Sequence, residues 1–175
     1  MRTGALRRLP DDTTPAEAVA RHATTVLLGL GNTILSDDGV GIKVVRHIAE
    51  HGAPPYCDIK EAEVAGFALL DLLEGYDRAV IVDAARLRDA RPGDVTVFDL
   101  ESLEPSLHLV AGHQIDLPSA LELGRRLERP VPRTVHVVGV QICDDTTFSE
   151  ECTPAIRAAI PVAADIAMRL VARGR

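Results

Sequence analysis

Three side chains able to bind metal or transfer protons follow predicted strands or precede a predicted helix. Asp38 comes after the apolar run TVLLGL at 25–30, Asp83 ends the run AVIVD, and His113 precedes a helical segment starting near 116. In parallel α/β sheets the functional crevice lies beyond the carboxyl ends of the strands. Two carboxylates and an imidazole would form a mixed oxygen and nitrogen site there for a borderline divalent cation. The same groups suit hydrolysis, through a metal-bound water or a carboxylate base.

Each of these residues also has a simpler structural explanation. Asp37 and Asp38 would stabilise a helix N-terminus by about 0.3–1 kcal/mol each. If Asp37 is only such a helix-start charge, Asp37→Asn should retain most activity. Asp83 could cap a turn, and His113 could be a solvated loop residue. The contexts of the other histidines indicate no function for them: His22, His47, His51, His108 (the main competitor of His113) and His136.

The turn after the first strand, GLGNTI at 29–34, resembles a dinucleotide-binding loop only in part. It has the first two glycines of that pattern, but Ile34 stands where the third belongs, and two carboxylates would repel a pyrophosphate. A nucleotide-binding module is therefore a lesser alternative. We expect Gly29 and Gly31 to allow a tight bend, and Asn32 to fix the loop by side-chain hydrogen bonds.

Composition places the chain among single-domain globular proteins. It has 175 residues, of which 46% are hydrophobic and 26% charged, with a net charge of −7. A negative charge of this size argues against binding to nucleic acid or to anionic membranes. No apolar stretch is long enough to span a bilayer.

The cysteines and the first residues indicate a cytoplasmic protein. Cys57, Cys143 and Cys152 show no metal-binding spacing and are read as reduced thiols. Residues 1–23 lack the apolar segment of a secretory signal and are interpreted as a polar N-terminal arm.

Strand-like and helix-like segments alternate after this arm. The fold class predicted from them is α/β, a three-layer αβα domain spanning 24–175. Its sheet should be mostly parallel, with about five strands and an antiparallel edge strand at 94–100. Pro161 should kink the last helix or mark a junction. The predicted strands are 25–30, 57–64, 79–85, 94–100 and 134–140, and the predicted helices 38–50, 66–76, 116–128 and from 153 onward.

Several motifs in a fixed order resemble the [NiFe]-hydrogenase maturation endopeptidases. They run from about Val26 to the last helix: LLGLGNTILSDDGVGIKVVRHI, LLDLLEGYDRAVIVDAA, GHQIDLPSALELGRRL and VVGV. The combination of GN-x4-DDGVG, a strand-end VDA and a downstream GHQ is specific to that family. The resemblance implies a protease that trims a C-terminal extension from a hydrogenase large-subunit precursor once nickel has been inserted.

The resemblance also implies a set of site residues and partners. The family's metal-contacting and catalytic positions fall on Asp38, Asp83 and His113. No cofactor is resident, since the nickel is supplied by the substrate precursor. The protease is expected to act as a monomer, without nucleic-acid or membrane partners. Segment 61–66 departs from the family's polar turn, which leaves a non-catalytic nickel-checkpoint binder as the alternative.

Overall fold

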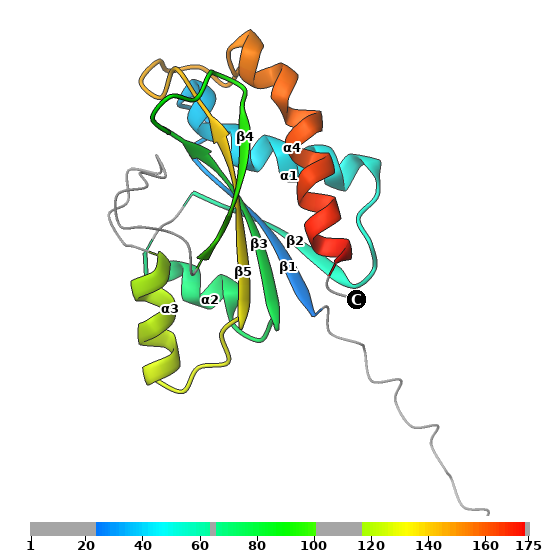
Figure 1. The fold of residues 1–175 in the computed structure, drawn as a ribbon, viewed down its shortest axis with the longest axis vertical. Helices are drawn as coiled ribbons and strands as arrows, with labels where there is room; N and C mark the ends of the chain where they lie inside the picture. Colours follow the sequence, from blue (N-terminus) through cyan, green and yellow to red (C-terminus); the bar gives the residue numbers. More distant parts are fainter. Residues whose placement is uncertain (1–23, 64–65, 101–116, 174–175) are drawn as a thin grey trace, which may run out of the picture.

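A five-stranded sheet forms the centre of the molecule. The computed structural model describes residues 24–63, 66–100 and 117–173 (Figure 1). The strand order is β2-β1-β3-β5-β4, and only β4 runs antiparallel to its neighbour. This confirms the predicted α/β sheet and its antiparallel edge strand. The strands are β1 (Thr25–Leu30), β2 (Cys57–Ala62), β3 (Arg78–Ala85), β4 (Val95–Asp99) and β5 (Thr134–Gln141).

The helices follow the prediction except at two points. The segment predicted as one helix from Asp38 begins instead as a short 3-10 helix, η1, which then continues into α1. Pro161 lies inside a single helix, α4, and so does not separate two helices. The helical elements are η1 (Ser36–Gly39), α1 (Val40–His51), α2 (Ala68–Leu73), α3 (Leu117–Arg126) and α4 (Pro154–Ala172).

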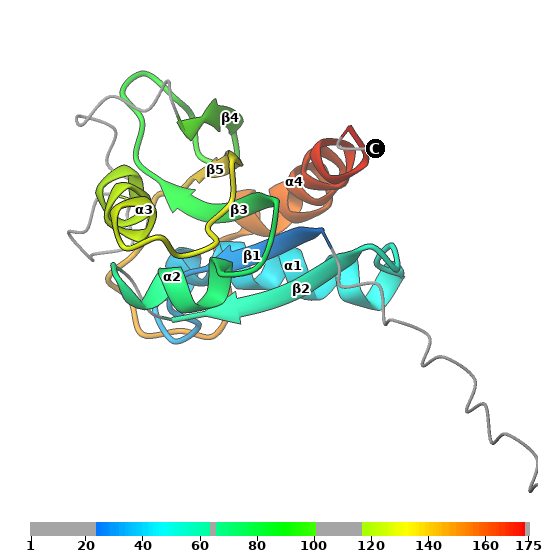
Figure 2. The ribbon, with the colours of Figure 1, turned by 90° about the horizontal axis from the view of Figure 1, so that it is seen from below.

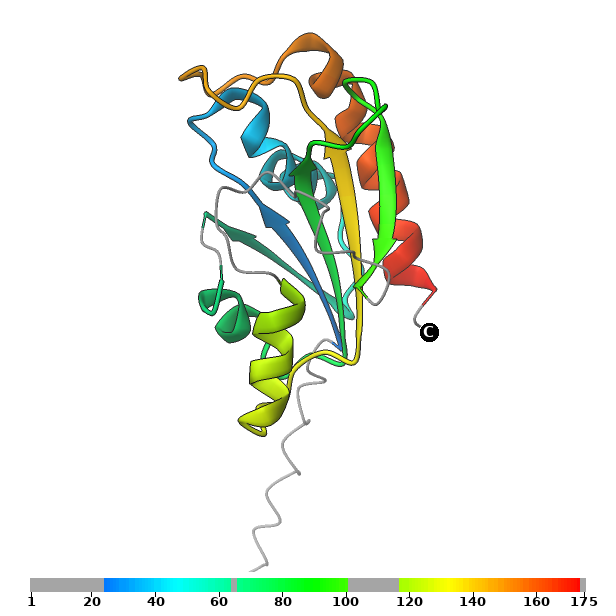
Figure 3. The same cartoon turned by 60° about the vertical axis from the view of Figure 1, so that its left-hand side comes forward.

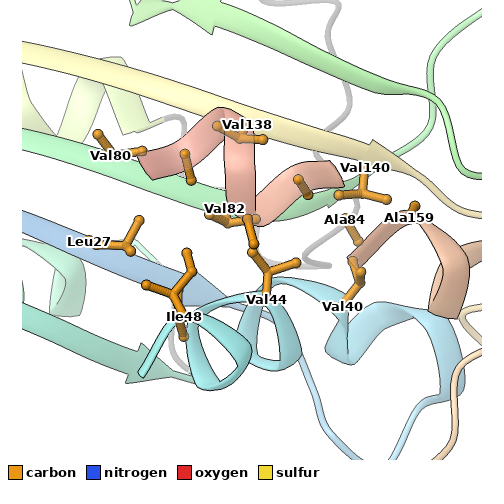
Figure 4. Packing of buried hydrophobic residues seen from close by; sticks show 14 of the residues in the cluster. Leu27, Val40, Val44, Ile48, Val80, Val82, Ala84, Val138, Val140 and Ala159 are labelled. Atoms are coloured by element: carbon orange, nitrogen blue, oxygen red, sulfur yellow. The ribbon is translucent and has the colours of Figure 1, made fainter. Parts of the chain in front are cut away.

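Helices cover both faces of the sheet, giving three layers (Figure 2). On one face α1 and α4 pack against Leu27, Val80, Val82 and Val138 (Figure 4). On the other face α2 and α3 pack against the alternate strand residues, such as Ile81. The central strands are continuous apolar runs because both of their faces are buried.

The strand connections diverge between β1 and β3. From β1 the chain passes through α1 to the edge strand β2 and returns to β3 on the other side of β1. After β3 the chain forms β4 and β5, which both lie on the side of β3 that is away from β1. Ligand sites of open α/β sheets lie where the connections diverge in this way, outside the carboxyl ends of the strands. The last pair in the β1–β3 register is Gly29 with Val82, so Asp83 lies at this point.

Some expectations concern parts of the chain that lie outside this description. The proposed arm at 1–23 and the loop containing His113 are not among the described residues. Within the described ranges, no helix combines the length and apolar character needed to cross a bilayer.

Candidate functional site

The loop from β1 to η1 is shaped by two glycines with different roles. Gly31 has a φ of +138°, and a Cβ there would lie 1.9 Å from the carbonyl oxygen of Asp38. Only glycine fits this bend, as predicted. Gly29 instead lies within β1, where a Cβ would lie 2.5 Å from the carbonyl oxygen of Gly41. Its role is therefore to let α1 approach the strand closely, rather than to bend the chain.

Asn32 fixes the conformation of this loop and the direction of Asp38. Its Oδ1 accepts a hydrogen bond from the backbone N–H of Ile34 at 3.1 Å, which confirms the expected side-chain role. Its own backbone N–H donates to Oδ2 of Asp38 at 2.9 Å. Asp38 is 7% exposed, so its access to solvent is limited.

Asp83 lies near the carboxyl end of β3, two residues before the strand ends at Ala85. Ala79 and Ile81, in the same row of side chains, belong to the apolar cluster under α2 and α3, so by alternation Asp83 extends this row toward the strand end. Its side chain is 1% exposed, and its Oδ1 accepts a hydrogen bond from the N–H of Ala84 at 2.8 Å.

The two acids influence one another electrostatically. Burial raises the pKa of Asp83 to about 8; the hydrogen bond from Ala84 opposes this rise, and the negative charge of Asp38 adds to it. Asp83 is therefore mostly protonated at neutral pH in this state of the protein. The structure thus brings together two of the three predicted site residues, at the point where the strand connections diverge.

The third predicted residue, His113, lies outside the described residues. The chain enters α3 four residues later, at Leu117. Leu117 packs in the same apolar cluster as the Ala79–Ile81 row that leads to Asp83. The place of His113 in the site therefore stays a prediction.

Asp37 has a structural role that its sequence context did not indicate. Its side chain is fully buried and belongs to η1. Three backbone N–H groups donate to its carboxylate: that of Thr153 to Oδ1 at 2.7 Å, and those of Asp144 and Cys143 to Oδ2 at 3.0 Å and 3.2 Å. Two side chains also donate to Oδ2, Thr153 through Oγ1 at 3.1 Å and Cys143 through Sγ at 3.4 Å. The interpretation of Asp37 as only a helix-start charge is therefore wrong. No local signal could have revealed these donors, because they lie more than 100 residues further along the chain.

The segment that Asp37 holds, the β5–α4 loop at 142–153, lies beside the β1–η1 loop (Figure 3). Ser36 N–H donates to the carbonyl of Ser149 at 2.8 Å, and Ser149 N–H donates to the carbonyl of Ile34 at 3.0 Å. Arg86 binds both carboxylate oxygens of Asp145, which ties the end of β3 to the same loop. These contacts hold together the β1–η1 loop, the β5–α4 loop and the end of β3, the segments next to the two acids.

The atypical segment at 61–66 also contacts the β1–η1 loop. Glu63 accepts a hydrogen bond from Oγ1 of Thr33 at 2.7 Å. Glu61 forms a two-bond ion pair with Arg46 of α1. Both acids thus have protein partners, which argues against their use in holding a nucleotide ribose. The buried carboxylates of η1 likewise disfavour a phosphate in this loop.

Known proteins that this chain resembles are named for the maturation, expression or formation of hydrogenases. Residues 42–170 match a family model described as hydrogenase maturation protease. The chain is 28% identical to a hydrogenase 2 maturation protease of Escherichia coli, over 66% of this chain and 71% of that protein. It is also 28% identical to the hydrogenase expression/formation protein HupD of Bradyrhizobium diazoefficiens, over 84% of this chain and 77% of that protein.

Solved structures show the same fold. The [NiFe] hydrogenase maturation protease HybD from Thermococcus kodakarensis superposes with a TM-score of 0.63 at 27% identity, covering 84% of this chain and 98% of that one. The maturating endopeptidase HybD of Escherichia coli, at 23% identity, gives a TM-score of 0.69 and covers 86% of this chain and 93% of that one. Since the family model matches well over half of the sequence, this protein belongs to the hydrogenase maturation protease family and is a peptidase.

Proposed function

We propose that this peptidase removes the C-terminal extension of a [NiFe]-hydrogenase large-subunit precursor after nickel insertion, as a cytoplasmic monomer. The proposal rests on the family assignment, because the related proteins are named as hydrogenase maturation proteases. The observation that supports this candidate site is the proximity of Asp38 and Asp83 between β1 and β3, where the strand connections diverge. The site needs no resident cofactor in this proposal, since the metal belongs to the substrate.

The electrostatics of this pair favour a cation-bearing substrate. Burial and the charge of Asp38 both oppose ionisation of Asp83. A divalent cation close to the two carboxyl groups reverses both effects, because positive charge stabilises the ionised forms. Asp38, Asp83 and His113 would then contact the nickel that the precursor carries. A precursor without nickel lacks this stabilisation, so it should bind and be cleaved less well.

Two hydrolytic routes are compatible with the acid pair. In one, Asp38 or Asp83 is the base for a water that the substrate's nickel polarises. In the other, the two carboxyl groups share a proton as in an acid protease, and nickel serves recognition only. Replacing nickel in the precursor by another divalent metal separates them, because only the first route makes the cleavage rate depend on the metal's acidity.

The decisive experiment is intact-mass spectrometry of the large-subunit precursor from the same organism, incubated with this protein. The precursor is prepared with and without inserted nickel, and the Asp38→Asn variant serves as the matched control. We expect a C-terminal fragment to be lost only from the nickel-loaded precursor and only with the unaltered protease.

Other results would change the proposal in defined ways. Cleavage irrespective of nickel would leave an endopeptidase but remove the role of Asp38, Asp83 and His113 as a nickel sensor. Stable binding of the loaded precursor without any change in its mass would replace the protease by the checkpoint binder.

A further inference from the structure

Two histidines and a glutamate gather at the C-terminal end of α1. His47, Glu50 and His51 are spaced i, i+3 and i+4, which puts them on one side of the helix. One donor atom from each side chain lies within 4.8 Å of those from the other two. The helix begins at Val40, two residues after Asp38, and rises about 1.5 Å per residue, so the cluster lies about 10–17 Å along it from the candidate active site. The cluster is therefore a separate location on the protein.

The two imidazoles lie against one another, and the backbone of α1 holds the ring of His51. Their ring centroids are 4.2 Å apart, with an interplanar angle of 39°. Nδ1 of His51 lies 2.8 Å from the backbone carbonyl oxygen of His47. A carbonyl can only accept, so this contact is a hydrogen bond when Nδ1 carries the proton. Nε2 of His51 then holds the lone pair, and a backbone carbonyl on the other ring nitrogen is the usual support of a metal-binding histidine.

The surroundings of the cluster favour a positive ion. The last turn of a helix carries the negative end of its dipole, and Glu50 adds a carboxylate there. The nearby cation Arg46 is bound through two hydrogen bonds to Glu61 of β2, so its charge is directed at that acid. His51 and Glu50 are exposed and His47 is half-buried, which leaves the side chains free to adjust around an ion.

We propose that His47, Glu50 and His51 form a second cation site, for a borderline divalent metal such as Zn²⁺ or Ni²⁺. Zn–N bonds of about 2.0–2.1 Å in tetrahedral geometry need the two ring nitrogens about 3.3 Å apart, which small rotations of exposed side chains supply. Water completes the coordination. The site excludes Mg²⁺, which prefers an all-oxygen shell. It is surface-accessible and independent of the nickel that the substrate brings to Asp38 and Asp83.

The test is isothermal titration calorimetry of the untagged full chain with Zn²⁺ alone, Ni²⁺ alone and Mg²⁺ alone. The variants are His47→Gln/His51→Gln, His47→Gln, and the matched control His136→Gln, whose ring contacts Asp99 on the opposite edge of the sheet. Asp38→Asn, measured in parallel, removes metal binding at the candidate active site. We expect the double variant to lose one equivalent of Zn²⁺ and Ni²⁺ binding, and both Asp38→Asn and His136→Gln to keep it.

The single variant His47→Gln tests whether a loss of binding in the double variant comes only from disruption of the helix end. His47→Gln leaves the backbone carbonyl that His51 contacts, and it should still weaken binding at least tenfold. Circular dichroism verifies that each variant is folded. Unchanged stoichiometry and affinity in the folded double variant would overturn the proposal, and so would binding of Mg²⁺ as tight as that of Zn²⁺.

Discussion

Asp37 and Asp38 are neighbours in one short helix, yet they serve opposite purposes. Asp37 is fully buried among five hydrogen-bond donors from the β5–α4 loop. Asp38 lies close enough to a second carboxyl group, Asp83, for its charge to help raise the pKa of that group. An acid whose lone pairs are filled by backbone donors anchors a loop. An acid close to another acid is suited to a cation or to proton transfer.

The comparison shows that burial alone does not indicate function. Asp37 and Asp83 are both almost inaccessible to solvent, at 0% and 1% exposure. Among the described residues, Asp83 receives a single donor, the N–H of its neighbour Ala84. The number and origin of the donors therefore distinguish the structural carboxylate from the candidate catalytic one.

The strongest test of this difference is Asp38→Asn. The amide retains an oxygen for the N–H of Asn32 but removes the negative charge. We expect cleavage of the nickel-loaded precursor to fall at least about 10²-fold, the usual effect of losing an acid–base group, with the melting temperature nearly unchanged. Steady-state kinetics and thermal denaturation measure the two. Normal cleavage would exclude Asp38 from the site.

The same isosteric change one residue earlier should act on stability instead. In Asp37→Asn an NH₂ group has to face backbone N–H donors, which leaves buried donors without an acceptor. We expect a loss of about 3 kcal/mol, or roughly 6–12 °C in melting temperature. Activity per folded molecule should persist at low temperature. A folded, fully stable and inactive variant would reverse the roles assigned to the two acids.

Asp83→Asn should reveal the raised pKa through the pH dependence of stability. The folded protein holds this proton up to a pKa of about 8, whereas the ordinary value is 3.8. Between these values the unfolded state binds fewer protons, so rising pH destabilises the unaltered protein. An asparagine does not titrate, so the stability advantage of the variant should grow from pH 5 to pH 7 by on the order of 2 kcal/mol. Urea denaturation at both pH values measures it, and a constant difference would contradict the raised pKa.

The smallest effect is expected from Arg86→Ala. Arg86 and Asp145 form an ion pair in which the side chains are 45% and 22% exposed. Such pairs contribute at most about 1 kcal/mol. Urea denaturation should therefore show a far smaller loss than for Asp37→Asn. An equal loss would mean that the ion pair, and not Asp37, anchors the β5–α4 loop.

The sheet was predictable from sequence because its strands are buried on both faces. The runs TVLLGL and AVIVDAA are mostly apolar and do not alternate with polar residues, and they became β1 and β3. The alternating pattern at 94–100 indicated a half-exposed edge strand, which is β4. The start of α1 was not predictable, because Gly41 packs its backbone against the carbonyl oxygens of Leu30 and Val82. That packing depends on three segments meeting in space.

The arrangement of the candidate site was predictable in part. That Asp38 and Asp83 lie close together could be predicted because strand ends of a parallel sheet meet at one edge. The anchoring role of Asp37 depends on Cys143, Asp144 and Thr153, which no local pattern connects to it. The spacing of the histidines on α1 is visible in the sequence. We could propose a metal site there only from the structure, in which His51 is hydrogen-bonded to the backbone of His47.

The anchoring of Asp37 also has a consequence for how the protein is made. Its donors are 106 to 116 residues later in the chain. At a synthesis rate of about 5–20 residues per second, they emerge from the ribosome on the order of 10 s after Asp37 itself. Until then the loop carrying Asp38 lacks these five hydrogen bonds, and the ends of a long chain segment still have to be brought together. The loop of the candidate active site is therefore completed only after the segment just before the last helix has been translated.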